Sequence, residues 1–270
     1  MRPNFCRAFG LFDIDAFQTM EGLLLITLLI GTGIVSGFIN TLAGGGSMIT
    51  LPALMIMGMP ADVANATNRV GVLMQSVTSV KGFDSQGYLD RRSLWVLLLI
   101  TGFGALGGAV LASVLPVWIL KPVLLITMII MALIMLIRPE AVVPSDGTIP
   151  RRLSENFMAA FGLFMSGVYG GFVQAGVGFI LIAALSGGLR YDLIRTNALK
   201  SVCTAVFSGL ALLVFAFQGQ VWWVPGLILA LGSIAGAWLG VRVALQVTQN
   251  TLKWFLFTMV CATCAGALFF

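Results

Sequence analysis

Two basic residues lie within apolar stretches of the sequence, where they could bind an anion. Arg69 and Lys200 each stand a few residues into an otherwise apolar segment. Ionisable side chains are rare inside membrane-spanning segments and mark functional sites. A guanidinium fork and an ammonium group both suit an oxyanion, so this pair predicts a site for a small anion. The alternative is that both side chains lie near the membrane boundary and extend to water.

A polar, glycine-rich motif precedes each of these cations. Its two copies are residues 36–47 (SGFINTLAGGGS) and residues 166–178 (SGVYGGFVQAGVG). Glycine is a poor helix former, so each motif is expected to break a helix. Irregular backbone at membrane depth is tolerated only where it is buried in protein or lines a wet cavity. Paired interruptions in the two halves of a membrane protein indicate the binding site of a transporter.

Polar residues near the two motifs complete the predicted substrate site. Backbone N–H groups at a helix start favour negative charge, so two cations near half-helix starts would surround an anion. Amides and hydroxyls can also donate to an anion oxygen, or can instead bond between helices. The predicted substrate-binding residues are Asn40, Thr41, Gly44, Gly45, Gly46, Thr67, Asn68, Arg69, Gln75, Gln174, Gly176, Thr196, Asn197 and Lys200.

The composition is that of an integral membrane protein. Of the 270 residues, 59% are hydrophobic and 9% are charged, whereas about 25% of residues are charged in soluble domains. A basic domain that could bind nucleic acid is missing. The chain has no histidine, which is the commonest metal ligand and the usual proton carrier near neutral pH. We therefore expect no metal, no cofactor and no catalytic set, and the chain is not expected to be an enzyme.

The apolar segments fall into two similar halves. They lie near residues 20–58, 64–83, 93–114, 117–138, 157–188, 196–217, 221–243 and 251–270. Thr67-Asn68 in the first half recurs as Thr196-Asn197 in the second, and such a repeat is a signal of architecture. The expected organisation is an N-terminal segment (1–19), a first transmembrane repeat (20–138), a polar linker (139–156) and a second transmembrane repeat (157–270).

Two of these segments are too long for one crossing. As a single helix, residues 20–58 would extend about 57 Å, whereas the hydrocarbon core is about 30 Å thick. Each long segment is therefore predicted to form two half-helices that meet at the glycine motif, as a re-entrant or a broken helix. Basic loops belong on the cytoplasmic side, and all of them except the loop that holds Lys121 reach that side if the long segments re-enter. The repeats would then be inverted, with simple parallel halves as the alternative.

The motifs also resemble those of a known family. Residues 37–47 (GFINTLAGGGS), then Leu51-Pro52 and residues 66–68 (ATN), resemble the TauE/SafE sulfite exporter family. The second half carries a weaker copy, and residues 174–178 (QAGVG) depart from the fuller glycine run of many relatives. The resemblance implies a secondary transporter in the bacterial inner membrane. Such a transporter moves small sulfur-containing anions such as sulfite, sulfoacetate or other sulfonates, often outward.

The sequence thus predicts an all-α polytopic transporter built from two four-segment repeats. Its partners would be a small anionic substrate and the lipid bilayer, and it would work by alternating access. A passive anion channel and a membrane scaffold or assembly protein without transport are the alternatives. The glycine pairs Gly104/Gly108 and Gly232/Gly236 have the spacing of close helix packing, either within the monomer or in a homodimer.

Overall fold

The computed structural model describes residues 20–91, 94–137 and 156–247, and within these ranges it contains helices and no strands. The first half contains α2 (Met20–Leu42), α3 (Ser47–Ile56), α4 (Ala61–Asp84), α5 (Leu94–Val114) and α6 (Val117–Ile137). The second half contains α7 (Phe157–Phe172), α8 (Val177–Ile182), the π-helical segment η4 (Ala183–Gly188), α9 (Leu193–Phe217) and α10 (Trp223–Gln246). The predicted all-helical class is confirmed for this part of the chain. The predicted segments 1–19 and 251–270 lie outside it, as does nearly all of the linker.

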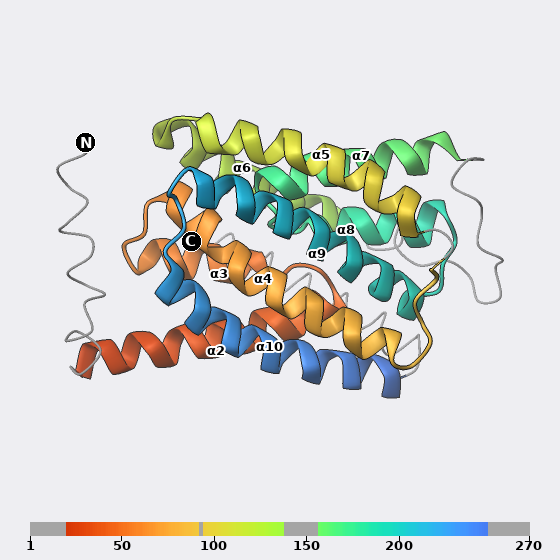
Figure 1. Cartoon of the computed structure of the whole chain (residues 1–270), viewed down its shortest axis with the longest axis horizontal. Coiled ribbons are helices and arrows are strands. Elements are labelled where there is room, and N and C mark those ends of the chain that lie inside the picture. The colour runs from red at the N-terminus through yellow and green to blue at the C-terminus, as the bar shows by residue number, and fades with distance from the viewer. Residues whose placement is uncertain (1–19, 92–93, 138–155, 248–270) are drawn as a thin grey trace.

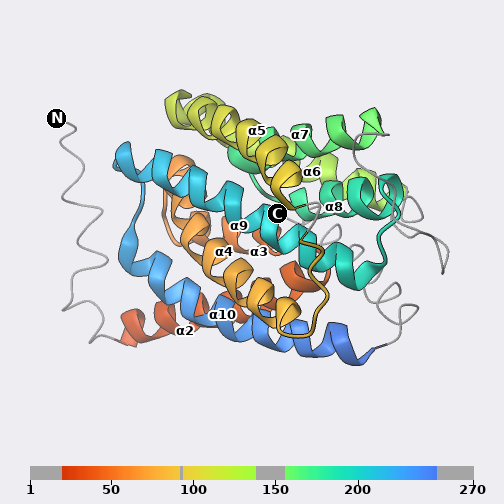
Figure 2. The same cartoon turned by 45° about the vertical axis from the view of Figure 1, so that its right-hand side comes forward.

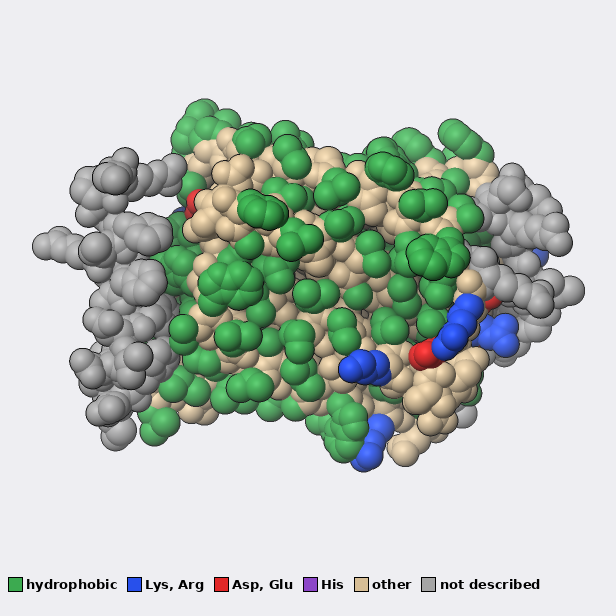
Figure 3. Space-filling model, viewed as in Figure 1, with side chains coloured by type: hydrophobic (Ala, Val, Ile, Leu, Met, Phe, Trp, Pro, Cys, Tyr) green, Lys and Arg blue, Asp and Glu red, His purple; other side chains and the backbone are tan. Residues whose placement is uncertain are grey.

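The helices are those of a multi-pass membrane protein. Four of them are long and apolar enough to cross a membrane, namely Gly22–Leu42, Leu94–Val114, Leu193–Phe217 and Trp223–Gln246. Their outward side chains include Phe103, Leu231 and Trp238, which are exposed. Figure 3 shows hydrophobic side chains spread over the whole visible face of the bundle. A surface of this kind suits contact with lipid rather than water.

Both glycine motifs break a helix, as predicted, and each break turns the chain back on itself. The breaks lie between α2 and α3 and between α7 and α8. Leu29, in the middle of α2, belongs to the same hydrophobic cluster as Leu54 near the end of α3. In the second half, Asn156 at the start of α7 donates from Nδ2 to the carbonyl of Gly188 at the end of η4, at 3.0 Å. Each long segment is therefore a helical hairpin, and the two ends of the second hairpin lie together.

The tips of the two hairpins meet backbone to backbone. A Cβ atom added to Gly44 would overlap the Cα of Gly178, and one added to Gly178 would overlap the Cα of Gly44. Gly44 also has a φ of +93°, a conformation that glycine adopts without steric cost. Only glycine allows this approach, so the two motifs fix the hairpins against each other in the buried interior.

Each hairpin packs against a long helix from the other half of the chain. The hairpin helix α2 of the first half packs most extensively on α10 of the second, and α7 of the second half packs most extensively on α5 of the first. Figures 1 and 2 both show these two pairs side by side, with α4 and α9 between them. The two halves are therefore interleaved rather than set next to each other.

The glycine pairs seen in the sequence form these contacts within the monomer. Gly232 and Gly236 of α10 lie against backbone carbonyls of α2, and Gly104 and Gly108 of α5 lie against carbonyls of α7. Small residues allow helix backbones to approach this closely. The pairs thus hold α2 and α7 in place, and a homodimer stays a prediction.

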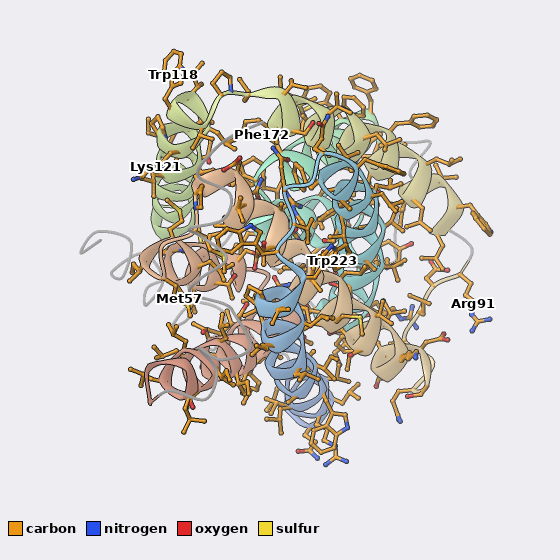
Figure 4. All side chains as sticks on the ribbon, turned by 60° about the vertical axis from the view of Figure 1, so that its left-hand side comes forward. Met57, Arg91, Trp118, Lys121, Phe172 and Trp223 are labelled. Atoms are coloured by element: carbon orange, nitrogen blue, oxygen red, sulfur yellow. The ribbon has the colours of Figure 1, made fainter. Side chains whose placement is uncertain are left out.

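The long helices run in both directions along the bundle. In Figure 1, α2 and α4 run from left to right and α5 returns, whereas α7 and α9 run from right to left and α10 returns. Exposed basic residues of the described ranges, other than Lys121, collect at one end of the bundle. Lys81 ends α4, Arg195 begins α9 and Arg242 lies near the end of α10, and Figure 3 shows this basic end at the right. Figure 4 shows Lys121 and Arg91 pointing outward on opposite sides of the molecule.

The glycine contact between the hairpins predicts a selective effect of added bulk. Gly44→Ala and Gly58→Ala both place alanine at a left-handed position, with φ of +93° and +89°, at a cost of about 1–2 kcal/mol each. A Cβ at Gly58 meets nothing within 4 Å, whereas a Cβ at Gly44 also forces the hairpins apart, at a further cost of about 1–3 kcal/mol. Thermal unfolding in detergent is expected to show the larger loss for Gly44→Ala. Equal losses would mean that the tip contact is not required.

Candidate functional site

Arg69 caps the broken end of α7. Its side chain is fully buried, and its guanidinium donates from Nη1 to the carbonyl of Gly170 and from Nη2 to the carbonyl of Gly171, the latter at 2.9 Å. These carbonyls belong to the last turn of α7, where they have no partner within the helix. Asn65, one turn earlier on α4, donates from Nδ2 to the carbonyl of Phe172 at 2.8 Å. One face of α4 in the first half thus closes the half-helix of the second half.

Lys200 caps the broken end of α2 in the same way. The side chain is 2% exposed, and Nζ donates to the carbonyls of Asn40 and Thr41 at 2.9 and 3.0 Å. Its third hydrogen bond goes to Oδ1 of Asn197, one turn earlier on α9, at 2.7 Å. An ammonium group has three donors, so these contacts use all of them. Here α9 of the second half closes the half-helix of the first.

Each half of the chain supplies the cation that caps the broken helix of the other half. The two caps together leave the interior positively charged. A cation at the C-terminal end of a helix is stabilised by the helix dipole. Within the described residues, neither cation pairs with a carboxylate, because the ion pairs there are Arg91–Asp84 and Arg195–Asp192 at the surface. Removing an unpaired charge from water is costly. An anion that approached either cap would therefore gain the attraction of an uncompensated charge.

Each cap also retains one unused donor. Arg69 Nε and Asn197 Nδ2 are buried and have no hydrogen-bond partner among the described residues. Arg69 belongs to the cap of α7, and Asn197 belongs to the cap of α2 through its contact with Lys200. Gln75 on α4 is buried with both amide atoms unpartnered as well. A buried donor without an acceptor costs about 1–3 kcal/mol, so these groups can bind a ligand favourably.

Gln174 makes the two halves of the site different. It lies in the second break with a φ of 67°, a conformation that costs about 1–2 kcal/mol for a residue with a Cβ. Its Oε1 accepts from Arg69, and its Nε2 donates to Oγ of Ser208 at 2.7 Å. The equivalent position in the first motif is Gly44, which is also left-handed. The second hairpin thus carries an amide that holds the guanidinium, and the first has no such group.

Asn68 and Thr67 connect helices. Asn68 donates from Nδ2 to Oγ of Ser47 at 3.1 Å and accepts from Oγ1 of Thr50 at 2.6 Å, which ties α4 to the start of α3. Thr67 Oγ1 accepts from the backbone N–H of Trp222 at 3.0 Å, just before α10 begins. The first Thr-Asn pair therefore holds the neighbouring elements in place.

Of the remaining predicted residues, Asn40 is half-buried and the others are buried. The hydroxyl groups of Thr41 and Ser79 share a hydrogen bond of 2.8 Å, and Thr196 donates to the carbonyl of Tyr191 at 3.2 Å. Bulk is also excluded at the other glycines: a Cβ on Gly45 would meet the ring of Phe179, and one on Gly46 would overlap the carbonyl of Ser36. Gly176 has a φ of 75°. The breaks are closely packed turns, which confirms that glycine is needed there.

The structure corrects one detail of the predicted site. The sequence placed the cations near half-helix starts, but the hydrogen bonds of Arg69 and Lys200 go to carbonyls at half-helix ends. The physical reason is that C-terminal carbonyls are acceptors and carry negative partial charge, which attracts a cation. Sequence reasoning also missed Asn65 and Ser208. Asn65 lies four residues before Arg69, on the same helix face, and that spacing could have indicated it.

Paired broken helices around a buried polar centre define a class, the polytopic membrane transporters. Comparison with known proteins agrees: residues 29–267 match the family model described as Sulfite exporter TauE/SafE. The chain therefore belongs to this family and is a membrane transporter rather than an enzyme. The resemblance inferred from the motifs is confirmed.

Curated relatives in bacteria carry corresponding names. A probable membrane transporter protein of Haemophilus influenzae (strain Rd) is 30% identical over 86% of this chain and 90% of its own length. The probable membrane transporter protein ORF9 of a Sinorhizobium species is 28% identical, over 85% and 87%. The probable membrane transporter protein YfcA of Escherichia coli K12 is 26% identical, over 85% and 84%. The similarity thus covers most of each protein.

The buried cap of α7 predicts that Arg69 matters for folding as well as for binding. Arg69→Met would leave the Gly170 and Gly171 carbonyls and the Gln174 amide without a donor, and breaking a buried charged network costs about 3–5 kcal/mol. Arg91→Met is the matched control, because the exposed Arg91–Asp84 pair is worth about 0–1 kcal/mol. Thermal unfolding of both purified variants measures the difference. If both lost the same small amount, the cap would contribute little to stability.

Proposed function

We propose that this protein exports small sulfur-containing anions, such as sulfite, sulfoacetate or a related organosulfonate, across the bacterial inner membrane. The observation that carries the proposal is that two buried cations, Arg69 and Lys200, have no carboxylate partner among the described residues. The name of the family, sulfite exporter, supports this class of substrate. The bacterial relatives support the location.

The anion would be bound by the donors that the caps leave unused. A sulfite or sulfonate group presents several oxygens, and Arg69 Nε and Asn197 Nδ2 are the buried donors of the two caps that find no partner among the described residues. Gln174 would fix the guanidinium plane so that Nε keeps its direction. Lys200 would contribute its charge, since its three donors already have acceptors. The other predicted polar residues and glycines would shape the site and hold the broken ends.

Alternating access would arise from two inverted repeats. The opposite directions of α2 and α7, of α4 and α9, and of α5 and α10 support this arrangement. In such transporters, one repeat or bundle rocks against the other around a central site. The contact between the hairpin tips at Gly44 and Gly178 would serve as the fixed point. The end that carries Lys81, Arg195 and Arg242 would face the cytoplasm, because basic residues collect there.

Anion binding can be measured as thermal stabilisation of the purified protein. A ligand that binds only the folded state at about 100 times its Kd stabilises by about 2.7 kcal/mol. Sulfite and sulfoacetate are expected to raise the melting temperature, and acetate at equal ionic strength is the control anion. Arg69→Lys keeps the charge but lacks Nε, so it should lose the shift, whereas Lys81→Gln at the exposed end of α4 should retain it. An equal shift in Arg69→Lys would remove Nε from the site.

Flux in proteoliposomes separates a transporter from a channel. Because alternating access binds one substrate in each cycle, sulfite efflux is expected to saturate with concentration. Efflux that rises linearly without saturation would favour the passive channel.

The inverted arrangement can be tested with two exposed loop positions. In a variant without the native cysteines, Gln86→Cys lies between α4 and α5, and Gln218→Cys lies between α9 and α10. Inverted repeats place these equivalent loops on opposite sides of the membrane. A membrane-impermeant maleimide added to spheroplasts should therefore label Gln218→Cys alone, and both should react after lysis. Labelling of both before lysis, or of neither, would indicate parallel halves.

A further inference from the structure

We propose that the ammonium group of Lys200 acts as a covalently attached cation in a cation site at the broken end of α2. It would occupy the place that a cation such as Na⁺ takes in other transporters, so that anion movement needs no metal cation from solution. This inference rests on the proposed function for its role in transport, but its structural part can be tested independently.

The contacts of Lys200 are those of a bound cation. Three oxygens lie 2.7–3.0 Å from Nζ, two of them from the last turn of α2 and one from the Asn197 amide. In transporters with discontinuous helices, unwound carbonyls and half-helix C-terminal ends coordinate Na⁺. The same chemical groups surround Nζ here. The ammonium group therefore fills a cation site with a nitrogen that is covalently attached to the protein.

The second broken end is filled in the same way. Arg69 donates to the carbonyls of Gly170 and Gly171 and to the Gln174 amide. In the part of the chain that the structure describes, no group of three or more Asp, Glu, Cys or His residues could hold a metal ion. Cation sites in proteins draw on carboxylate and carbonyl oxygens. The carbonyl groups at both broken ends that would suit a metal cation are therefore already bound by side chains.

The hydrogen bonds of Lys200 also connect the two halves of the protein. Lys200 belongs to α9 of the second half, whereas Asn40 and Thr41 belong to the hairpin of the first. A dissociable cation would leave this end of α2 open whenever its concentration fell. A covalently attached cation keeps the hairpin bound to α9 at any salt composition.

Chemical rescue tests the cation site directly. Lys200→Ala removes a group with the size and charge of n-propylammonium, and it should lower the melting temperature because three acceptors lose their donor. Addition of n-propylammonium chloride is expected to restore most of this loss, relative to the same concentration of choline chloride. NaCl should stabilise Lys200→Ala in the same direction. The wild type, in which Nζ fills the site, should show neither response.

Lys200→Met is the matched control. Its unbranched apolar side chain fills the space without a charge, so neither n-propylammonium nor Na⁺ should stabilise it more than choline does. The proposal is overturned if folded Lys200→Ala responds equally to all three cations, or if Lys200→Met responds as strongly as Lys200→Ala. An equal response in the exposed variant Lys81→Ala would also overturn it, because the effect would then be one of general salt.

A second measurement uses the wild type and decides the matter if Lys200→Ala cannot be purified in folded form. Sulfite efflux from proteoliposomes is compared in sodium, potassium and choline buffers. The rate is expected to be the same in all three, and a tenfold loss without sodium would overturn the proposal. If sulfur anions neither bind nor move, the proposed function fails, while rescue of Lys200→Ala still supports the cation site. If sulfur anions bind but n-propylammonium does not rescue Lys200→Ala, the proposed cation site is overturned and the proposed function stands.

Discussion

The structure depends on how the open ends of two broken helices are satisfied inside an apolar body. Ending a helix in the interior leaves carbonyl groups without partners, and neither lipid nor an apolar core can supply donors. Lys200 provides them for α2, and Arg69 provides them for α7. Each cation comes from the opposite half of the chain. Neither hairpin can therefore satisfy its last carbonyl groups without the other half. The contacts that stabilise the fold are the same contacts that form the candidate site.

The glycines allow these contacts to form. Gly44 and Gly178 let the hairpin tips touch, and the small residues of α5 and α10 let these helices lie directly on α7 and α2. The resulting interleaved body places α4 and α9 side by side at the centre. Since the helices that carry the cations are held by both halves, a movement of either hairpin must act on the cap supplied by the other. This is the kind of coupling that a two-state transporter requires.

The arrangement also divides the polar residues into two groups. Asn68, Thr67 and Thr196 have their hydrogen bonds within the protein and hold helices in place. Arg69 Nε and Asn197 Nδ2 have no partners in the described part of the chain. A membrane protein can afford few such groups, because each one is costly in the absence of water. The positive charge of the caps and these two donors are what the described interior offers to an anion of the class expected for this family.

The sequence by itself determined the membrane class, the two helix breaks and the family, because composition and glycine spacing act locally along the chain. It also located Arg69, Lys200 and Gln174, since charged and amide side chains are conspicuous in apolar segments. Tertiary structure decided what these side chains touch. The hydrogen bonds of the two caps join residues 101 and 160 positions apart, and no local pattern specifies such a partner. The end of each half-helix that receives a cation was fixed only when the two halves interleaved, because that packing brings the unpaired carbonyls of one half to the charged helix of the other.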